Sequence, residues 1–184
     1  ARKLEVEATV PLDAFYQCWH ISSRLDKRYY IADLITEILG GGASSRLFQK
    51  LVKEQQIFSH IECHHFGSCD NGLLAIEGKL VKGVRLPDAE KAVQDVIQKL
   101  QEEAVTEAEL QKVKNKTESM IAFEDMSLMN RANSLAYYEL LGDAELINSE
   151  LDKYASITPQ EILEESRRVF RHDNSNTLYY KAKH

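Results

Sequence analysis

The chain has 184 residues, of which 43% are hydrophobic and 28% charged, and its net charge is −6. This length suits a single domain with one core, and the acidic balance argues against nucleic-acid binding, which normally uses a basic surface. No apolar run reaches the length of a membrane span, and the three cysteines form no recognisable disulfide framework.

Two strand patterns open the chain. Residues 3–10, "KLEVEATV", alternate between apolar and polar side chains, which predicts a half-buried strand whose apolar side carries Leu4, Val6, Ala8 and Val10. The aromatic-rich run "AFYQCWHI" (14–21) predicts a second strand. Apolar residues at helical spacing then predict a helix that begins after Asp26 and is ended by the glycines at 40–42, because glycine tolerates the left-handed conformation.

The middle of the chain begins with a short helix that Ser44 or Ser45 can cap. Two strands are predicted at 57–66, "IFSHIECHHF", and 72–81, "GLLAIEGKLV". They are separated by the turn-rich "GSCDN", and a helix over about 88–103 follows them.

In the last part of the chain, Thr106 and Thr158 each precede a glutamate three residues later, which is the capping-box pattern of a helix start. Between these starts lies a long helical region that ends near Gly142 and whose apolar positions include Met126, Met129 and Leu140. The run "TLYYKA" (177–182) predicts a final strand.

Strands and helices are grouped in this order rather than strictly alternating. The sequence therefore predicts an α+β fold with two layers, a mostly antiparallel sheet covered on one face by helices. Residues 1–184 are expected to form one domain. Because the chain starts at Ala1 within a strand pattern, we expect it to be excised from a longer, two-domain chain, and the compartment is left open between cytoplasm and periplasm.

Several motifs favour structural rather than chemical roles. The run "GGGASSR" lacks the lysine of a phosphate-binding loop and follows a helix rather than a strand, which argues against nucleotide binding. No G-x-S-x-G elbow is present. The tyrosine pairs at 29–30, 137–138 and 179–180 are interpreted as packing residues.

The run "HIECHHFGSC" offers possible metal ligands. On a strand, His60, Glu62 and His64 point to one side, whereas Cys63 and His65 point to the other. Zinc sites usually add ligands from elsewhere in the fold, so a partly exposed strand face is the favoured interpretation and no metal is expected in this domain. A metal-dependent hydrolase built on the first three residues is kept as a weaker hypothesis.

Four segments, taken in order, resemble zinc peptidases of the insulinase (pitrilysin) family, which includes the mitochondrial processing peptidases. They are "ILGGGASSRLFQKLVKE", "VTEAELQKVKNK", "NRANSLAYYELLGD" and "YASITPQEI". Members pair two related α+β domains, and the first domain holds zinc through an H-x-x-E-H helix and a later glutamate. This chain has no H-x-x-E-H, so the resemblance implies the second, zinc-free domain, with zinc in a missing N-terminal domain.

In active relatives the second domain often supplies an arginine, and a tyrosine seven residues later, that bind substrate in a pattern like R-E-x-x-G-L-A-Y. An ungapped match places these positions at Val52 and Ser59, and the glycine at Gln56. Val52 has no donor, and Ser59 is too short to replace a tyrosine. The resemblance therefore implies a substrate-binding element whose two polar groups are substituted here, with no catalytic residue in this domain.

The resemblance implies a non-catalytic C-terminal domain of a zinc endopeptidase, which forms part of the substrate chamber and of a domain or dimer interface. Its expected partners are the N-terminal peptidase domain of the same chain, a peptide substrate, and a second subunit in a homodimer or heterodimer. The alternative is a structural or scaffold homologue without a proteolytic role.

Overall fold

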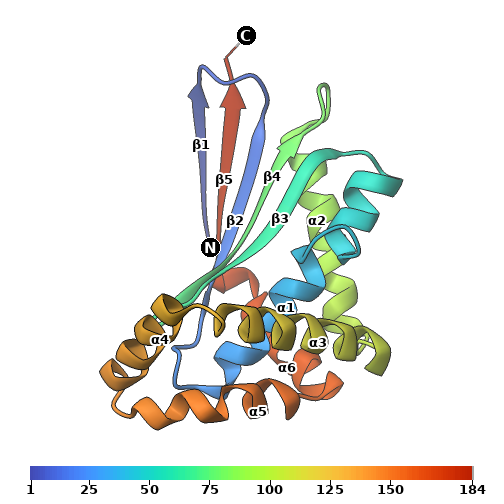
Figure 1. Ribbon diagram of the computed structural model, residues 1–184. Helices are drawn as coiled ribbons and strands as arrows, with labels where there is room; N and C mark the ends of the chain where they lie inside the picture. The colour runs from blue at the N-terminus through green and yellow to red at the C-terminus, as the bar shows by residue number, and fades with distance from the viewer. Residues whose placement is uncertain (184) are drawn as a thin grey trace.

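The computed structural model describes residues 1–183 and contains a five-stranded sheet in the order β1-β5-β2-β4-β3 (Figure 1). The strands are β1 (Arg2–Ala8), β2 (Ala14–Ile21), β3 (Phe58–Phe66), β4 (Gly72–Leu80) and β5 (Ser175–Ala182). β1 pairs with β5 in parallel, and the β5–β2, β2–β4 and β4–β3 pairings are antiparallel. The predicted, mostly antiparallel sheet is confirmed.

Helices cover one face of this sheet, and the predicted α+β class is confirmed (Figure 1). They are α1 (Lys27–Gly40), α2 (Leu86–Glu102), α3 (Glu107–Glu124), α4 (Leu128–Leu140), α5 (Glu150–Ala155) and α6 (Pro159–Val169), with a π-helical segment η1 (Phe48–Glu54) and 3-10 turns η2 (Ala144–Ser149) and η3 (His172–Asn174). The core between the two layers includes the fully buried Phe15, Trp19 and Leu34. Among residues 1–183, no helix has both the length and the apolar character needed to cross a membrane.

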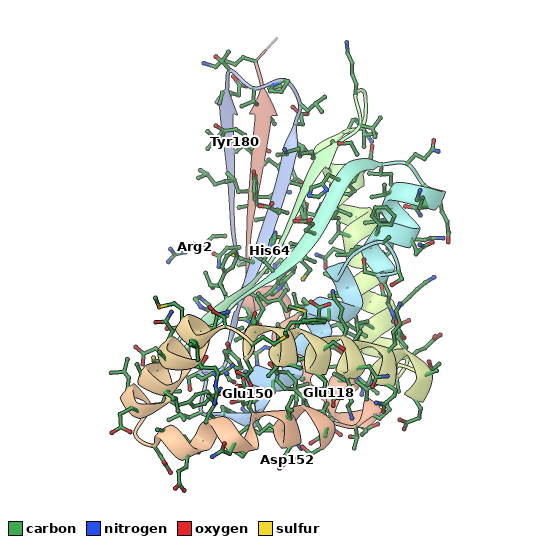
Figure 2. All side chains as sticks on the ribbon, viewed as in Figure 1. Arg2, His64, Glu118, Glu150, Asp152 and Tyr180 are labelled. Carbon is green, nitrogen blue, oxygen red and sulfur yellow. The ribbon has the colours of Figure 1, made fainter. Side chains whose placement is uncertain are left out.

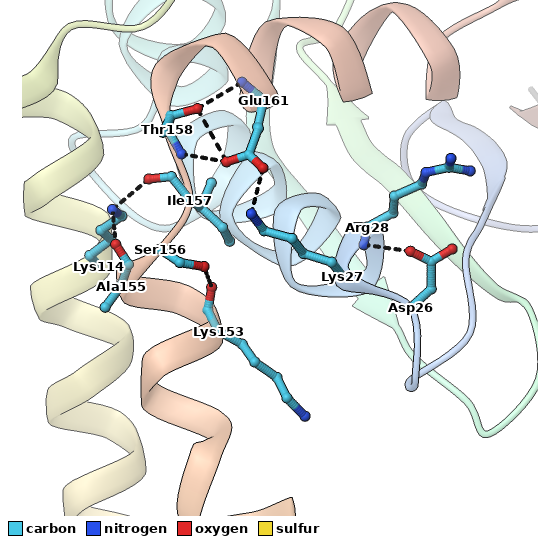
Figure 3. Close-up of polar contacts among 10 residues, drawn as sticks. All are labelled: Asp26, Lys27, Arg28, Lys114, Lys153, Ala155, Ser156, Ile157, Thr158 and Glu161. Atoms are coloured by element: carbon cyan, nitrogen blue, oxygen red, sulfur yellow. Dashed lines mark hydrogen bonds and ion pairs between the residues drawn. The ribbon is translucent and has the colours of Figure 1, made fainter.

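The predicted helix starts at Asp26, Thr106 and Thr158 are confirmed, since each side chain accepts a hydrogen bond from a backbone N–H of the first turn. At Thr158 the complete capping box forms, because Glu161 Oε2 also accepts from the backbone N–H of Thr158 at 2.9 Å (Figure 3). Such a cap contributes about 1 kcal/mol to helix stability. The local sequence signals therefore fix where these helices begin.

The glycines at 40–42 have different roles, which corrects the prediction that all three end the helix through their conformation. Only Gly42 takes the left-handed conformation, with φ of 99°. Gly40 is still part of α1, where a Cβ atom would lie 2.2 Å from the backbone nitrogen of Cys63 in β3. Gly40 thus allows α1 to approach the sheet closely, and Gly42 makes the turn.

The long helical region predicted between Thr106 and Gly142 is divided into α3 and α4. Ser127 caps α4 by accepting from the backbone N–H of Asn130 at 3.4 Å. The apolar side chains expected to be inside are largely exposed, with Met126 at 78%, Met129 at 69% and Leu140 at 76%. Apolar spacing on a helix marks a face, but it does not show whether another layer covers that face.

β1 corrects a second prediction, because its apolar side is not buried. Leu4 pairs with Leu178 on the face away from the helices and is 60% exposed. On the opposite side, Lys3 donates to Tyr179 at 2.7 Å and to Glu90 of α2 at 2.8 Å. Apolar and charged side chains do alternate between the two faces of this edge strand, but the charged side faces the helices.

Candidate functional site

The first expected substrate-binding position lies in η1. Val52 is partly buried and packs against the hydrophobic core. Its neighbour Lys53 is exposed and extends over the Phe48 ring, with 5.6 Å from Nζ to the ring centroid. η1 therefore presents an apolar side chain where the resemblance expects an arginine.

The second expected position, Ser59, lies at the start of β3. The register shifts between Phe58 and His60, so Ser59 occupies a bulge, where its Oγ donates to the backbone oxygen of Lys79 at 3.1 Å. Between the two positions, Gln56 has φ of 52°, the conformation that favours glycine. The backbone at Gln56 thus has the conformation that a glycine at this position would favour; a contact with substrate at Val52 and Ser59 stays a prediction.

β3 divides the potential metal ligands as predicted. Cys63 and His65 face the helices, where burial raises the pKa of the Cys63 thiol and lowers the pKa of the His65 imidazole. His60, Glu62 and His64 share the other face and have side chains between 35% and 51% exposed. Only this second set is accessible to a ligand from solution.

The structure adds Glu77 of β4 to this group, which sequence reasoning missed. His64 Nε2 lies 3.5 Å from Glu62 Oε2 and 3.5 Å from Glu77 Oε1, and His60 Nε2 lies 3.4 Å from Glu62 Oε1. Figure 2 labels His64 on the sheet and Glu150 among the helices. The alternation of the 72–81 strand places Glu77 on one face, but only the pairing register brings it opposite Glu62.

The sheet face turned away from the helices, here called the open face, carries an apolar groove beside these residues. The groove has a volume of about 840 Å³. It crosses β1, β5, β2 and β4, and its lining includes Leu4, Tyr16, Cys18, Ala75 and Leu178. An uncovered sheet face of this kind is suited to contact with another protein surface or an extended peptide.

A separate polar cluster joins the start of α1 to α4 and α5. Arg24 forms an ion pair with Glu150 and donates to the Tyr138 hydroxyl at 2.7 Å, while the rings of Tyr29 and Tyr30 lie 4.7 and 5.1 Å from its guanidinium carbon. Burial opposes the charge on Arg24, but Glu150 and the tyrosines outweigh it and raise the pKa of Arg24. Tyr29, Tyr30 and Tyr138, interpreted from the sequence as packing residues, thus pack around a largely buried cation.

Solved structures share this fold. A protease from Helicobacter pylori superposes with a TM-score of 0.91 at 20% identity, covering 98% of this chain and 44% of that chain. The inactive peptidase domain of a protein named as a zinc protease, from Bordetella parapertussis, superposes with a TM-score of 0.84 at 15% identity and covers 97% of both chains. That solved domain therefore has almost the same extent as this chain.

The family follows from the sequence itself. The family model described as the peptidase M16 inactive domain matches residues 2–117, and the chain belongs to this family. The resemblance to the inactive domain of these metallopeptidases is confirmed. An uncharacterized zinc protease of Streptomyces coelicolor, SCO5738, is 26% identical over 151 residues, which cover 80% of this chain. The chain spans about a third of the length of the curated relatives it matches.

Proposed function

We propose that this chain is the non-catalytic C-terminal domain of a zinc-dependent endopeptidase, and that its open face lines the peptide chamber and meets the N-terminal peptidase domain. One observation carries the proposal: helices cover only one face of the sheet, and the other face holds an apolar groove of about 840 Å³. Apolar sheet faces gain free energy when another layer or a ligand removes them from water.

The length of the relatives supports this assignment. Two relatives named zinc proteases are each more than twice as long as this chain, which leaves room for a second domain. The sequence contains no H-x-x-E-H, so we assign the zinc and its activated water to the N-terminal domain. The residues of this domain would confine the peptide and would take no part in activating the water.

A scaffold role is the second candidate, and Val52 and Ser59 favour it. Both positions lack the side chains that bind substrate in the active relatives that the sequence resembles. A homodimer or heterodimer in which a related subunit supplies those groups would reconcile these substitutions with proteolysis. Without such a subunit, the parent protein would bind or support other chains and cleave nothing.

A matched pair of variants tests the interface. Leu4 lines the groove and is 60% exposed, whereas Leu25 lies in the loop before α1 and is 59% exposed. We expect Leu4→Asp to weaken binding of this chain to its separately produced N-terminal domain at least about tenfold, because a carboxylate would be buried without a partner, and Leu25→Asp to have no effect. Titration calorimetry measures both. Equal effects, or no binding by the wild-type chain, would rule the interface out.

Cleavage separates the two candidates. The full-length protein, alone and with its related subunit, is incubated with an unstructured peptide, and the 184-residue chain is assayed beside it. Chelator-sensitive cleavage by the full-length protein and none by the isolated chain support the endopeptidase assignment. Absence of cleavage in every combination supports the scaffold, and turnover by the isolated chain would contradict both.

A further inference from the structure

The pairing register brings two carboxylates together without a lysine or arginine partner. Glu62 of β3 lies directly opposite Glu77 of β4, and like charges in this position destabilise a sheet. Among residues 1–183, only His60 and His64 lie within ion-pair distance of either carboxylate. Lys79, two residues along β4 from Glu77, makes no ion pair with either. A positive charge between the two glutamates would relieve their repulsion.

We propose that Glu62, His64 and Glu77 bind a divalent transition-metal ion of the zinc class on the open face. Their ligand atoms all lie within 4.8 Å of one another, and the two histidine–carboxylate separations are 3.5 Å each. Zinc bonds of about 2.0–2.2 Å in a tetrahedron require ligand atoms about 3.3–3.6 Å apart. The two separations between His64 Nε2 and the carboxylate oxygens already have that length. A small side-chain rotation would bring the oxygens of Glu62 and Glu77 to the same separation.

The donor types favour this class of ion. An imidazole nitrogen together with two carboxylates suits zinc or a neighbouring first-row metal, whereas calcium and magnesium prefer oxygen ligands throughout. His60 supports the arrangement, because its Nε2 contacts the carboxylate oxygen of Glu62 that faces away from His64. Such neighbouring contacts hold a ligating carboxylate in its orientation. The inference concerns binding alone and does not depend on the parent protein being a peptidase.

Cobalt(II) is the probe for the test, because its visible absorbance reports the coordination geometry, and zinc is added in competition. The 184-residue chain is used without a histidine tag and with the accessible Cys18 and Cys69 changed to serine, so that no thiol on the surface binds metal. We expect one equivalent of cobalt to bind with a tetrahedral spectrum and to be displaced by zinc. Absence of binding would overturn the proposal.

Variants assign the site. His64→Gln and Glu77→Gln should each lower the affinity at least about tenfold, the lower bound for disturbing a metal site. His20→Gln, which removes another exposed histidine of the open face, should leave it unchanged. Equal losses in all three variants would show non-specific binding and overturn the assignment.

Thermal unfolding adds a readout that a merely structural cluster would not give. In chelator at about pH 8, where histidine is ordinarily neutral, Glu77→Gln should unfold at a higher temperature than its parent, because one of two facing charges is gone. With zinc the order should reverse, since only the parent gains stability from the ion. If Glu77→Gln unfolds at a lower temperature than its parent in chelator as well, the two facing carboxylates do not destabilise the sheet and the proposal fails.

Discussion

Gln56 is the one residue other than glycine with a left-handed backbone in the described chain, with φ of 52°. This conformation costs a residue with a Cβ atom about 1–2 kcal/mol, whereas glycine adopts it freely. Glycine also has more freedom to lose on folding, which costs about 0.4–1 kcal/mol. The difference predicts that Gln56→Gly raises the free energy of unfolding by about 1 kcal/mol, or the melting temperature by about 2–4 °C for a chain of this size.

The neighbouring residue provides the control. Gln55 is also exposed but has φ of −88° and ψ of −20°, an ordinary right-handed conformation. Gln55→Gly therefore gains nothing from the backbone and should lower the free energy of unfolding by about 0.5–1 kcal/mol. Urea and thermal denaturation of the two variants measure both effects. If both changes destabilise the protein, the backbone at Gln56 is not strained and the reasoning is refuted.

Two further predictions concern the packing of α1 and of the polar cluster. Gly40→Ala should destabilise the protein by at least about 2 kcal/mol, because the added Cβ would overlap the backbone of Cys63; an unchanged urea midpoint would contradict this. Arg24→Met should cost about 3 kcal/mol, because it leaves the carboxylate of Glu150, now 15% exposed, without its partner. Adding Glu150→Gln to Arg24→Met should recover part of that loss. If the stability losses of the two single variants simply add in the double variant, the pair does not interact.

Local signals in the sequence predict much of the fold. Asp26, Thr106 and Thr158 identify helix starts because capping depends on residues only a few positions apart. The burial of β1 could not be predicted in this way. Its alternation shows that Leu4 and Lys3 lie on opposite faces, but which face meets helices depends on the pairing with β5 far along the chain. The exposure of Met129 likewise depends on what covers α4.

The candidate site shows the same limit. That His60, Glu62 and His64 share a face follows from the period of a strand, and the structure agrees. Glu77 could be added only by knowing the register between β3 and β4. At Gln56 the resemblance places a glycine, and the backbone there has a φ of 52°, the conformation that favours glycine.

The pairing of β1 with β5 has a consequence for synthesis of the chain. Lys181 contacts Glu5 across 176 residues, so β1 has no strand to pair with in the sheet until β5 has been synthesised. Contacts so distant in sequence form late, after shorter loops have closed. β5 lies between β1 and β2, and the start of β1 and the end of β5 lie at opposite ends of the sheet (Figure 1). A chain that stops before Ser175 would therefore lose two strands from its sheet, and the exposed edge of β2 would be free to pair with other chains.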